Sequence, residues 1–100
     1  MHEIEHVPGP MWRQWVDANR ATIIDVREPV EWADGTLPGA ERVSLGELPH
    51  RIASLDRSIP TLVVCRSGAR SARAAEFLSR AGFRSVANLV GGMVAVGMAT

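Results

Sequence analysis

Short apolar, β-branched runs alternate with helical patterns along this 100-residue chain. Residues 22–26, 61–64 and 85–89 have the length and composition of buried strands. The second run is almost wholly apolar, which is typical of a central strand in a parallel sheet that is covered on both faces. Strands that alternate with helices predict an α/β fold, and we expect one domain over residues 1–100.

Apolar residues at helical spacing predict the segments between the strands. These segments are residues 11–18, 29–33, 45–55 and about 69–81. In the last of them, the spacing predicts a buried stripe of Ala74, Phe77, Leu78 and Ala81. A brief strand is expected around Val43, and Gly91-Gly92 predicts a turn from the last strand into a C-terminal helix.

The charge balance narrows the range of partners. Acidic and basic residues number 11 each, and the formal net charge is zero at pH 7. This balance argues against nucleic acid and against a membrane surface as partners. Five basic residues nevertheless crowd into one stretch: Arg66, Arg70, Arg73, Arg80 and Arg84. A local site for a small anion is therefore expected.

The chain has one cysteine, so no internal disulfide is expected. It contains no stretch typical of a secretory signal or a membrane span, so we expect a reducing cytoplasm, where a free thiol persists. One cysteine and three scattered histidines provide no metal-ligand cluster. We therefore expect neither a metal nor a cofactor.

The single cysteine, Cys65, directly follows the buried run at residues 61–64. Between it and the helix lies a short loop that consists of Arg66, Ser67, Gly68, Ala69 and Arg70. Backbone N–H groups of such a loop, together with the helix dipole, favour an anion. A cysteine after an apolar run can also be an inert core residue. The electropositive loop favours a reactive, nucleophilic Cys65 over that alternative.

The loop length bears on the type of chemistry. No histidine lies near Cys65 in the sequence to act as a general base, which favours a pre-ionised thiolate. Sulfur transfer and phosphoryl transfer both fit such a group. Cysteine-dependent phosphatases place an arginine after five intervening residues, whereas Arg70 follows Cys65 after four and Ser71 occupies the later position. The shorter loop suits a single sulfur atom better than a phosphate.

Three further residues are candidates for a supporting role. Asp25 stands in an apolar strand, where a carboxylate needs partners such as loop amides or an arginine. Arg27 is expected to pair with Asp25 or with one of the neighbouring glutamates. Trp32 is expected to pack beneath the site.

Several motifs together resemble the rhodanese (thiosulfate sulfurtransferase) homology domain. They are Asp25-Val26-Arg27-Glu28, Glu31-Trp32, Gly35-Thr36-Leu37-Pro38-Gly39-Ala40, the loop at residues 65–70, and Leu89-Val90-Gly91-Gly92. The resemblance implies a five-stranded, mainly parallel sheet flanked by helices. It also implies that Cys65 takes a sulfur from thiosulfate or a related donor as a persulfide and passes it to cyanide or a thiol.

Two positions depart from this family's pattern. Thr36 stands where histidine is common, and Val96 where an aromatic residue is common. The partners implied are a small anionic sulfur donor, a thiol or cyanide acceptor, and, on one view, a sulfur-relay protein. Two alternatives stay open: a non-enzymatic persulfide carrier that docks on a protein partner, and a small cysteine-dependent phosphatase or arsenate reductase.

Overall fold

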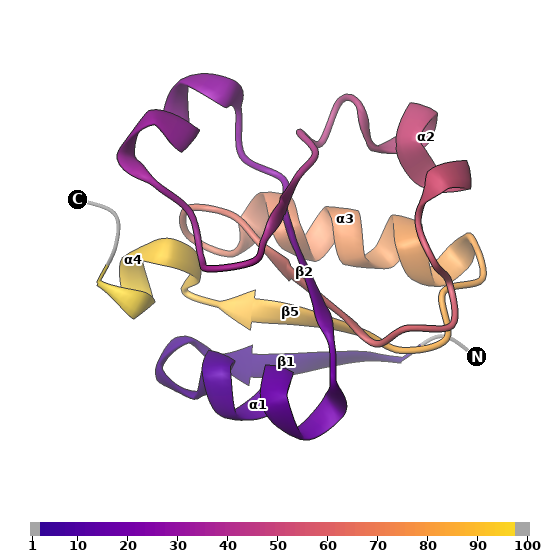
Figure 1. Cartoon of the computed structure of the whole chain (residues 1–100), viewed down its shortest axis with the longest axis horizontal. Helices are drawn as coiled ribbons and strands as arrows, with labels where there is room; N and C mark the ends of the chain where they lie inside the picture. The colour runs from indigo at the N-terminus through magenta and orange to yellow at the C-terminus, as the bar shows by residue number, and fades with distance from the viewer. Residues whose placement is uncertain (1–2, 98–100) are drawn as a thin grey trace.

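A five-stranded sheet forms the centre of the protein in a computed structural model that describes residues 3–97. Its strands are β1 (Ile4–Pro8), β2 (Thr22–Asp25), β3 (Glu41–Arg42), β4 (Thr61–Val64) and β5 (Val86–Val90). They lie in the order β1-β5-β4-β2-β3, and each pairing is parallel (Figure 1). The predicted α/β fold with a parallel sheet is therefore confirmed.

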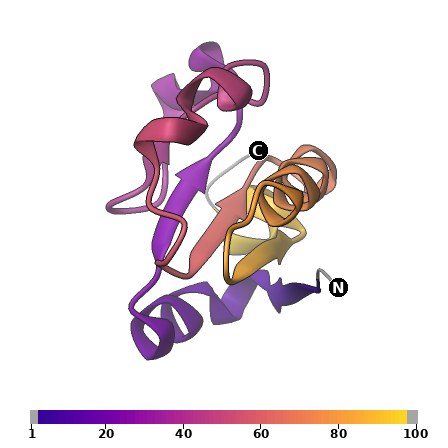
Figure 2. The same cartoon turned by 90° about the vertical axis from the view of Figure 1, so that its right-hand side faces the viewer.

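Helices cover both faces of the sheet. The α-helices are α1 (Trp12–Asn19), α2 (Leu48–Arg51), α3 (Ala69–Arg80) and α4 (Gly92–Val96). Within the described residues, three short 3₁₀ helices accompany them: η1 (Gly9–Met11), η2 (Pro29–Asp34) and η3 (Ile52–Ser54). Figure 2 shows α1 and α3 on opposite sides of the sheet. None of the helices within residues 3–97 has the length and apolar character needed to cross a membrane.

Alternation along β4 divides the core into two clusters. Val63 and Cys65 point into the cluster that includes residues of α2 and α3, whereas Leu62 and Val64 point into the other, which α1 and α4 cover. Side chains of successive strand residues point to opposite faces, so a strand covered on both sides reads as a continuous apolar run. The residue that follows β4 therefore belongs to the face that α3 covers.

The buried stripe of α3 is rotated from the predicted one. Phe77 is 37% exposed, so its predicted burial is wrong. The buried residues of this helix are instead Ser71, Ala74, Ala75, Leu78 and Ser79. Small side chains face the sheet, which lets the helix backbone lie close to β4 and β5, and the bulky ring is turned outward.

Strand β1 was not predicted, because an edge strand carries little of the apolar signal. Only Val7 of its five residues is buried, although the strand pairs with β5 along its length. The strand expected around Val43 lies just before this residue, at Glu41–Arg42. Val43 instead follows it and donates its N–H to the carbonyl of Asp25 at 3.0 Å.

The turn predicted at Gly91-Gly92 joins β5 to α4 and brings α4 against the loop that follows β4. The Met93 N–H donates to the Cys65 carbonyl at 2.9 Å, and the Val94 N–H donates to the Arg66 carbonyl at 3.0 Å. Gly92 has a φ of +57°, and a Cβ there would overlap the carbonyl oxygens of Cys65 and Arg66. The close approach of these two segments therefore requires glycine.

We predict that Gly92→Ala destabilises the protein more than Gly39→Ala does. Both glycines have positive φ, but a Cβ at Gly39 meets no atom within 4 Å. Left-handed strain costs each variant about 1–2 kcal/mol, and the overlap at Gly92 adds about 1–3 kcal/mol. Urea denaturation of both variants measures the difference, and equal losses of stability would contradict the close packing at Gly92.

Candidate active site

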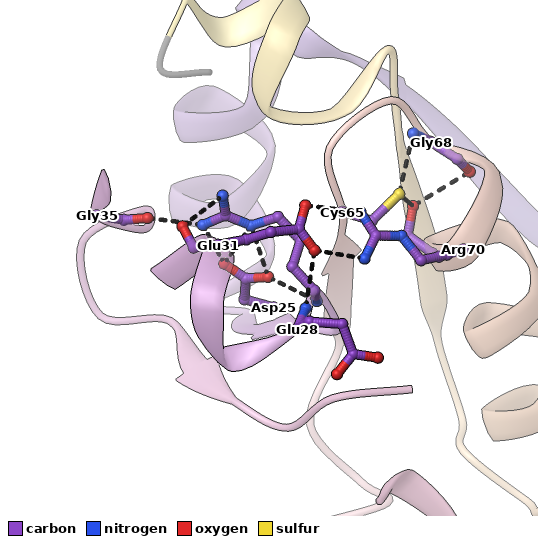
Figure 3. Close-up of polar contacts among 9 residues, drawn as sticks. Asp25, Glu28, Glu31, Gly35, Cys65, Gly68 and Arg70 are labelled. Carbon is purple, nitrogen blue, oxygen red and sulfur yellow. Dashed lines mark hydrogen bonds and ion pairs between the residues drawn. The ribbon is translucent and has the colours of Figure 1, made fainter. Parts of the chain in front are cut away.

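Cys65 lies at the carboxyl end of β4, at the edge where ligands of parallel α/β sheets gather. The residue is only 1% exposed, yet its sulfur is not enclosed by apolar groups alone. The Gly68 N–H donates to Cys65 Sγ at 3.0 Å, and Ser71 Oγ lies 3.3 Å from the same atom. Figure 3 shows the loop curling over the sulfur. The structure thus combines a buried thiol with polar donors aimed at it.

These donors determine the ionisation of the thiol. Burial alone raises the pKa of Cys65, because a low-dielectric environment disfavours the thiolate. Hydrogen bonds from the Ser71 hydroxyl and from the backbone N–H groups of Ser71, Gly68 and Ser67 oppose this effect. They outweigh it, and the pKa of Cys65 lies below its ordinary value of 9.0. A lowered pKa of this kind is typical of reactive cysteines.

The Ser71 hydroxyl has more acceptors than protons. Its oxygen lies 2.5 Å from Asn88 Oδ1, 3.2 Å from the Gly68 carbonyl and 3.3 Å from Cys65 Sγ. A hydroxyl donates one hydrogen bond at a time, so Asn88 competes with the sulfur for that proton. Ser71 and Asn88 are both buried, and they link α3 to β5 directly behind Cys65.

Arg70, the last predicted loop residue, forms an ion pair. Its NH1 and NH2 groups donate to the two carboxylate oxygens of Glu31 in η2, at 2.6 and 2.9 Å (Figure 3). The hydrogen bonds from Arg70 lower the pKa of Glu31 to about 2, and the same pair raises the pKa of Arg70. The charge of Cys65 also contributes to the shift at Arg70, which places this guanidinium within electrostatic reach of the sulfur.

Asp25 and Arg27 form a second, fully buried ion pair at the end of β2. Arg27 NH2 lies 2.8 Å from Asp25 Oδ2, and Thr36 Oγ1 donates to the same carboxylate oxygen at 2.5 Å. Arg27 also donates to the carbonyls of Glu31 and Gly35, at 3.3 and 2.6 Å. The pair therefore fastens η2, the element that carries Glu31, to the sheet.

The remaining predicted site residues differ in exposure. Arg66, Ser67 and Ala69 are exposed on the loop. Trp32 is partly buried, and its Nε1 is a buried side-chain atom without a hydrogen-bond partner within residues 3–97. Val96, one of the two departures, is partly buried against the cluster that contains Leu62 and Val64.

Sequence reasoning overlooked the roles of Ser71, Asn88 and Glu31 in the surroundings of Cys65. Ser71 entered only as the position where a phosphatase would carry arginine, and Glu31 only as part of the Glu31-Trp32 motif and as one candidate partner of Arg27. Asn88 had a readable signal, because it is the one polar residue in the run Val86–Val90. The same signal, a polar residue in an apolar strand, did draw attention to Asp25.

Among residues 3–97, no group of three or more histidine, cysteine, aspartate or glutamate side chains is placed to hold a metal ion. The groups that contact Cys65 Sγ are instead hydrogen-bond donors, which suit an anionic sulfur.

Comparison with known proteins identifies the family. The sequence model of the rhodanese-like domain matches residues 11–99. The chain belongs to the rhodanese-like family.

Individual relatives and a solved structure agree with this family assignment. It is 34% identical over 94 residues to the putative sulfurtransferase YtwF of Bacillus subtilis, covering 93% of this chain and 90% of that one. It is 36% identical over 83 residues to the putative sulfur carrier protein YrkF of the same species, covering 82% of this chain but 45% of the relative. A crystal structure of a rhodanese-like domain protein from Staphylococcus aureus matches with a TM-score of 0.84 at 27% identity, covering 94% and 92% of the two chains.

We predict that Arg27→Met destabilises this rhodanese-like domain by about 3–5 kcal/mol, because it leaves the Asp25 carboxylate buried without its partner. The matched control is Arg51→Met, which breaks an ion pair with Glu41 whose side chains are 42% and 51% exposed. That change should cost less than about 1 kcal/mol.

The pH dependence of the same comparison gives a second readout. Burial opposes ionisation of Asp25, but hydrogen bonds from Arg27 and Thr36 hold its pKa below the ordinary 3.8. The ion pair therefore stabilises the wild type fully above pH 3.8, and this contribution disappears as pH falls through the lower folded value. The stability gap between wild type and Arg27→Met should narrow in the same direction. A gap that is constant down to pH 2 would contradict the pairing.

We predict that Ser71→Ala raises the pKa of Cys65 and shifts the alkylation rate profile toward higher pH. One donor to the thiolate is lost, and a neutral hydrogen bond contributes about 1 kcal/mol, so alkylation by iodoacetamide near neutral pH should slow about fivefold. Ser79→Ala removes a hydroxyl from the same buried face of α3 and is the control. Identical profiles for the two variants would show that Ser71 does not act on the sulfur.

Proposed function

We propose that this rhodanese-like chain is a sulfurtransferase in which Cys65 is the nucleophile and carries the sulfur as a persulfide. The observation that carries the proposal is the Gly68 N–H at 3.0 Å from Cys65 Sγ, in a loop whose donors lower the pKa of the thiol. An inert core cysteine has no need of such donors. The family's sulfurtransferases and the sulfur carrier among the relatives support the same sulfur chemistry.

In the first half-reaction, the Cys65 thiolate attacks the outer sulfur of thiosulfate or a related donor. A bond forms between Sγ and this outer sulfur, and the bond to the donor's central sulfur breaks. The electron pair of the broken bond leaves with sulfite, a dianion. The persulfide carries the single negative charge that the thiolate had, so charge and electrons balance and neither an oxidant nor a reductant is needed.

In the second half-reaction, cyanide or a thiolate attacks the outer sulfur of the persulfide. The S–S bond breaks, its electron pair returns to Sγ, and thiocyanate or a new persulfide leaves. Because the resting thiolate is regenerated, the cycle needs no metal, no cofactor and no separate general base. A reducing cytoplasm, where a free thiol persists, is the compartment that suits this cycle.

Loop length supports sulfur transfer over phosphoryl transfer. Four residues separate Cys65 from Arg70, and the donors converge on one sulfur atom. A phosphatase needs a cradle that serves several phosphate oxygens together with the arginine. Here both terminal nitrogens of Arg70 already donate to Glu31. We therefore favour a sulfurtransferase over a phosphatase or an arsenate reductase as the function of this chain.

A persulfide carrier that serves a protein partner is the second candidate. The likeness to a putative sulfur carrier protein favours it, and nothing in the chemistry of Cys65 distinguishes a carrier from an enzyme. The two differ in the acceptor: an enzyme turns over small thiols or cyanide, whereas a carrier passes its sulfur rapidly to one protein only.

We predict that thiosulfate treatment adds the mass of one sulfur atom at Cys65, and that cyanide removes it with release of thiocyanate. Intact-mass spectrometry with peptide mapping measures the first step, and a thiocyanate assay measures the second. Cys65→Ala and Cys65→Ser should show neither, because they lack the thiolate. Full turnover by Cys65→Ser would remove Cys65 from the mechanism, and turnover of an aryl phosphate without sulfur uptake would favour the phosphatase. Sulfur uptake that no small acceptor discharges would favour the carrier.

A further inference from the structure

The ion pair between Glu31 and Arg70 limits how strongly this site attracts an anion. The guanidinium of Arg70 interacts electrostatically with Cys65, and its NH1 and NH2 groups already donate to a carboxylate. The side chain of Arg70 is 31% exposed and that of Glu31 is 24% exposed, so both form part of the surface beside the sulfur. An incoming donor therefore meets a neutralised arginine.

Glu31 is held firmly in this place. Its Oε1 accepts the Glu28 N–H at 2.9 Å as well as the Arg70 bond at 2.6 Å, and together with Glu28 it forms the capping box of η2. Because its pKa is about 2, Glu31 is ionised at neutral pH. Swinging Glu31 away would release Arg70 but would break both the ion pair and the cap.

A second carboxylate adds to the same effect. Glu28 also acts electrostatically on Arg70. Around this arginine there are thus two carboxylates and, in the resting state, the Cys65 thiolate. These three negative charges act against each additional negative charge on a donor, and so they favour a monoanion over a dianion.

We propose that Glu31 is a specificity-determining residue that selects sulfur donors with a single negative charge, such as thiosulfonates and alkyl persulfides, over dianionic thiosulfate. This inference rests on the proposed sulfurtransferase function and specifies its donor class. Removing the charge of Glu31 should weaken the preference for monoanionic donors, because Arg70 becomes available to the donor and one repelling charge is lost.

The test compares thiosulfate with methanethiosulfonate, which offers the same kind of outer sulfur with one negative charge fewer and leaves as a sulfinate. We would measure kcat/KM for both donors, with cyanide as acceptor, in wild type and in Glu31→Gln. The thiosulfate to methanethiosulfonate ratio is expected to rise about fivefold in the variant, the change that one unit of charge produces across about 4 Å in water. Any effect of the substitution on thiol ionisation or on the packing of η2 changes both donors alike and cancels in the ratio.

Glu76→Gln is the matched control, because it removes one carboxylate charge from an exposed position further along α3. Its ratio should equal that of the wild type. An unchanged ratio in Glu31→Gln, an equal change in Glu76→Gln, or a shift toward methanethiosulfonate would overturn the inference. The last of these results would mean that Glu31 prepares Arg70 for the dianion.

The salt dependence of the wild type gives an independent test that needs no variant. If the carboxylates around Arg70 repel dianions, a higher ionic strength screens this repulsion. Raising it from about 0.01 M to about 0.15 M should then raise kcat/KM for thiosulfate more than for methanethiosulfonate. A selective fall for thiosulfate would overturn the inference. Failure of both donors to load Cys65 would contradict the proposed function itself, whereas loading by both without charge discrimination contradicts only the role of Glu31.

Discussion

The direction of one peptide group connects the ionisation of Cys65 to the packing of α4. The Arg66 carbonyl points to α4, where it accepts the Val94 N–H at 3.0 Å. In a trans peptide the C=O and the following N–H point to opposite sides, so the Ser67 N–H is turned away from α4 and toward the sulfur, where it helps to lower the pKa of Cys65. Only a residue without a Cβ at Gly92 lets α4 come close enough for this contact. The electrostatics of Cys65 therefore depend on the packing of α4.

The two ion pairs near the site differ in burial and therefore in what they do. Asp25 and Arg27 have side-chain exposures of 0% and 4%, and the pair is surrounded by further hydrogen bonds from Thr36 and to the loop carbonyls. Such a pair fixes the position of η2 more than it adds net stability. The Glu31–Arg70 pair is partly exposed and stands on the element that the first pair fixes. The buried pair thus positions the charge that a donor meets.

The sequence predicted those parts of the fold whose signal is local. The strand at Thr61–Val64, the helix that begins at Ala69 and the turn at Gly91-Gly92 follow from apolar runs and from glycine. Strand β1 escaped prediction because its stability comes from pairing with β5, which its own mostly exposed residues do not reveal. The partner of Arg70 escaped for a related reason, since Glu31 lies 39 residues away in the chain and meets it only through the fold.

Because the sulfur of Cys65 is buried, different groups face the negative charge in the two states of the proposed cycle, the thiolate and the persulfide. With Cys65 1% exposed, the thiolate charge rests on the loop amides and the Ser71 hydroxyl. In a persulfide the charge moves to an outer sulfur about 2 Å from Sγ, beyond the hydrogen bonds made to Sγ itself. That outer atom has to lie on the side from which donor and acceptor approach, which in this proposal is the side of Arg70 and Glu31. Stabilising the thiolate is then a property of the loop amides and of Ser71, whereas the choice of donor and the release of sulfur depend on Arg70 and on the Glu31 side chain that η2 supplies. Substitutions in η2 can therefore alter the specificity for the sulfur donor while the backbone N–H groups around Cys65 stay in place.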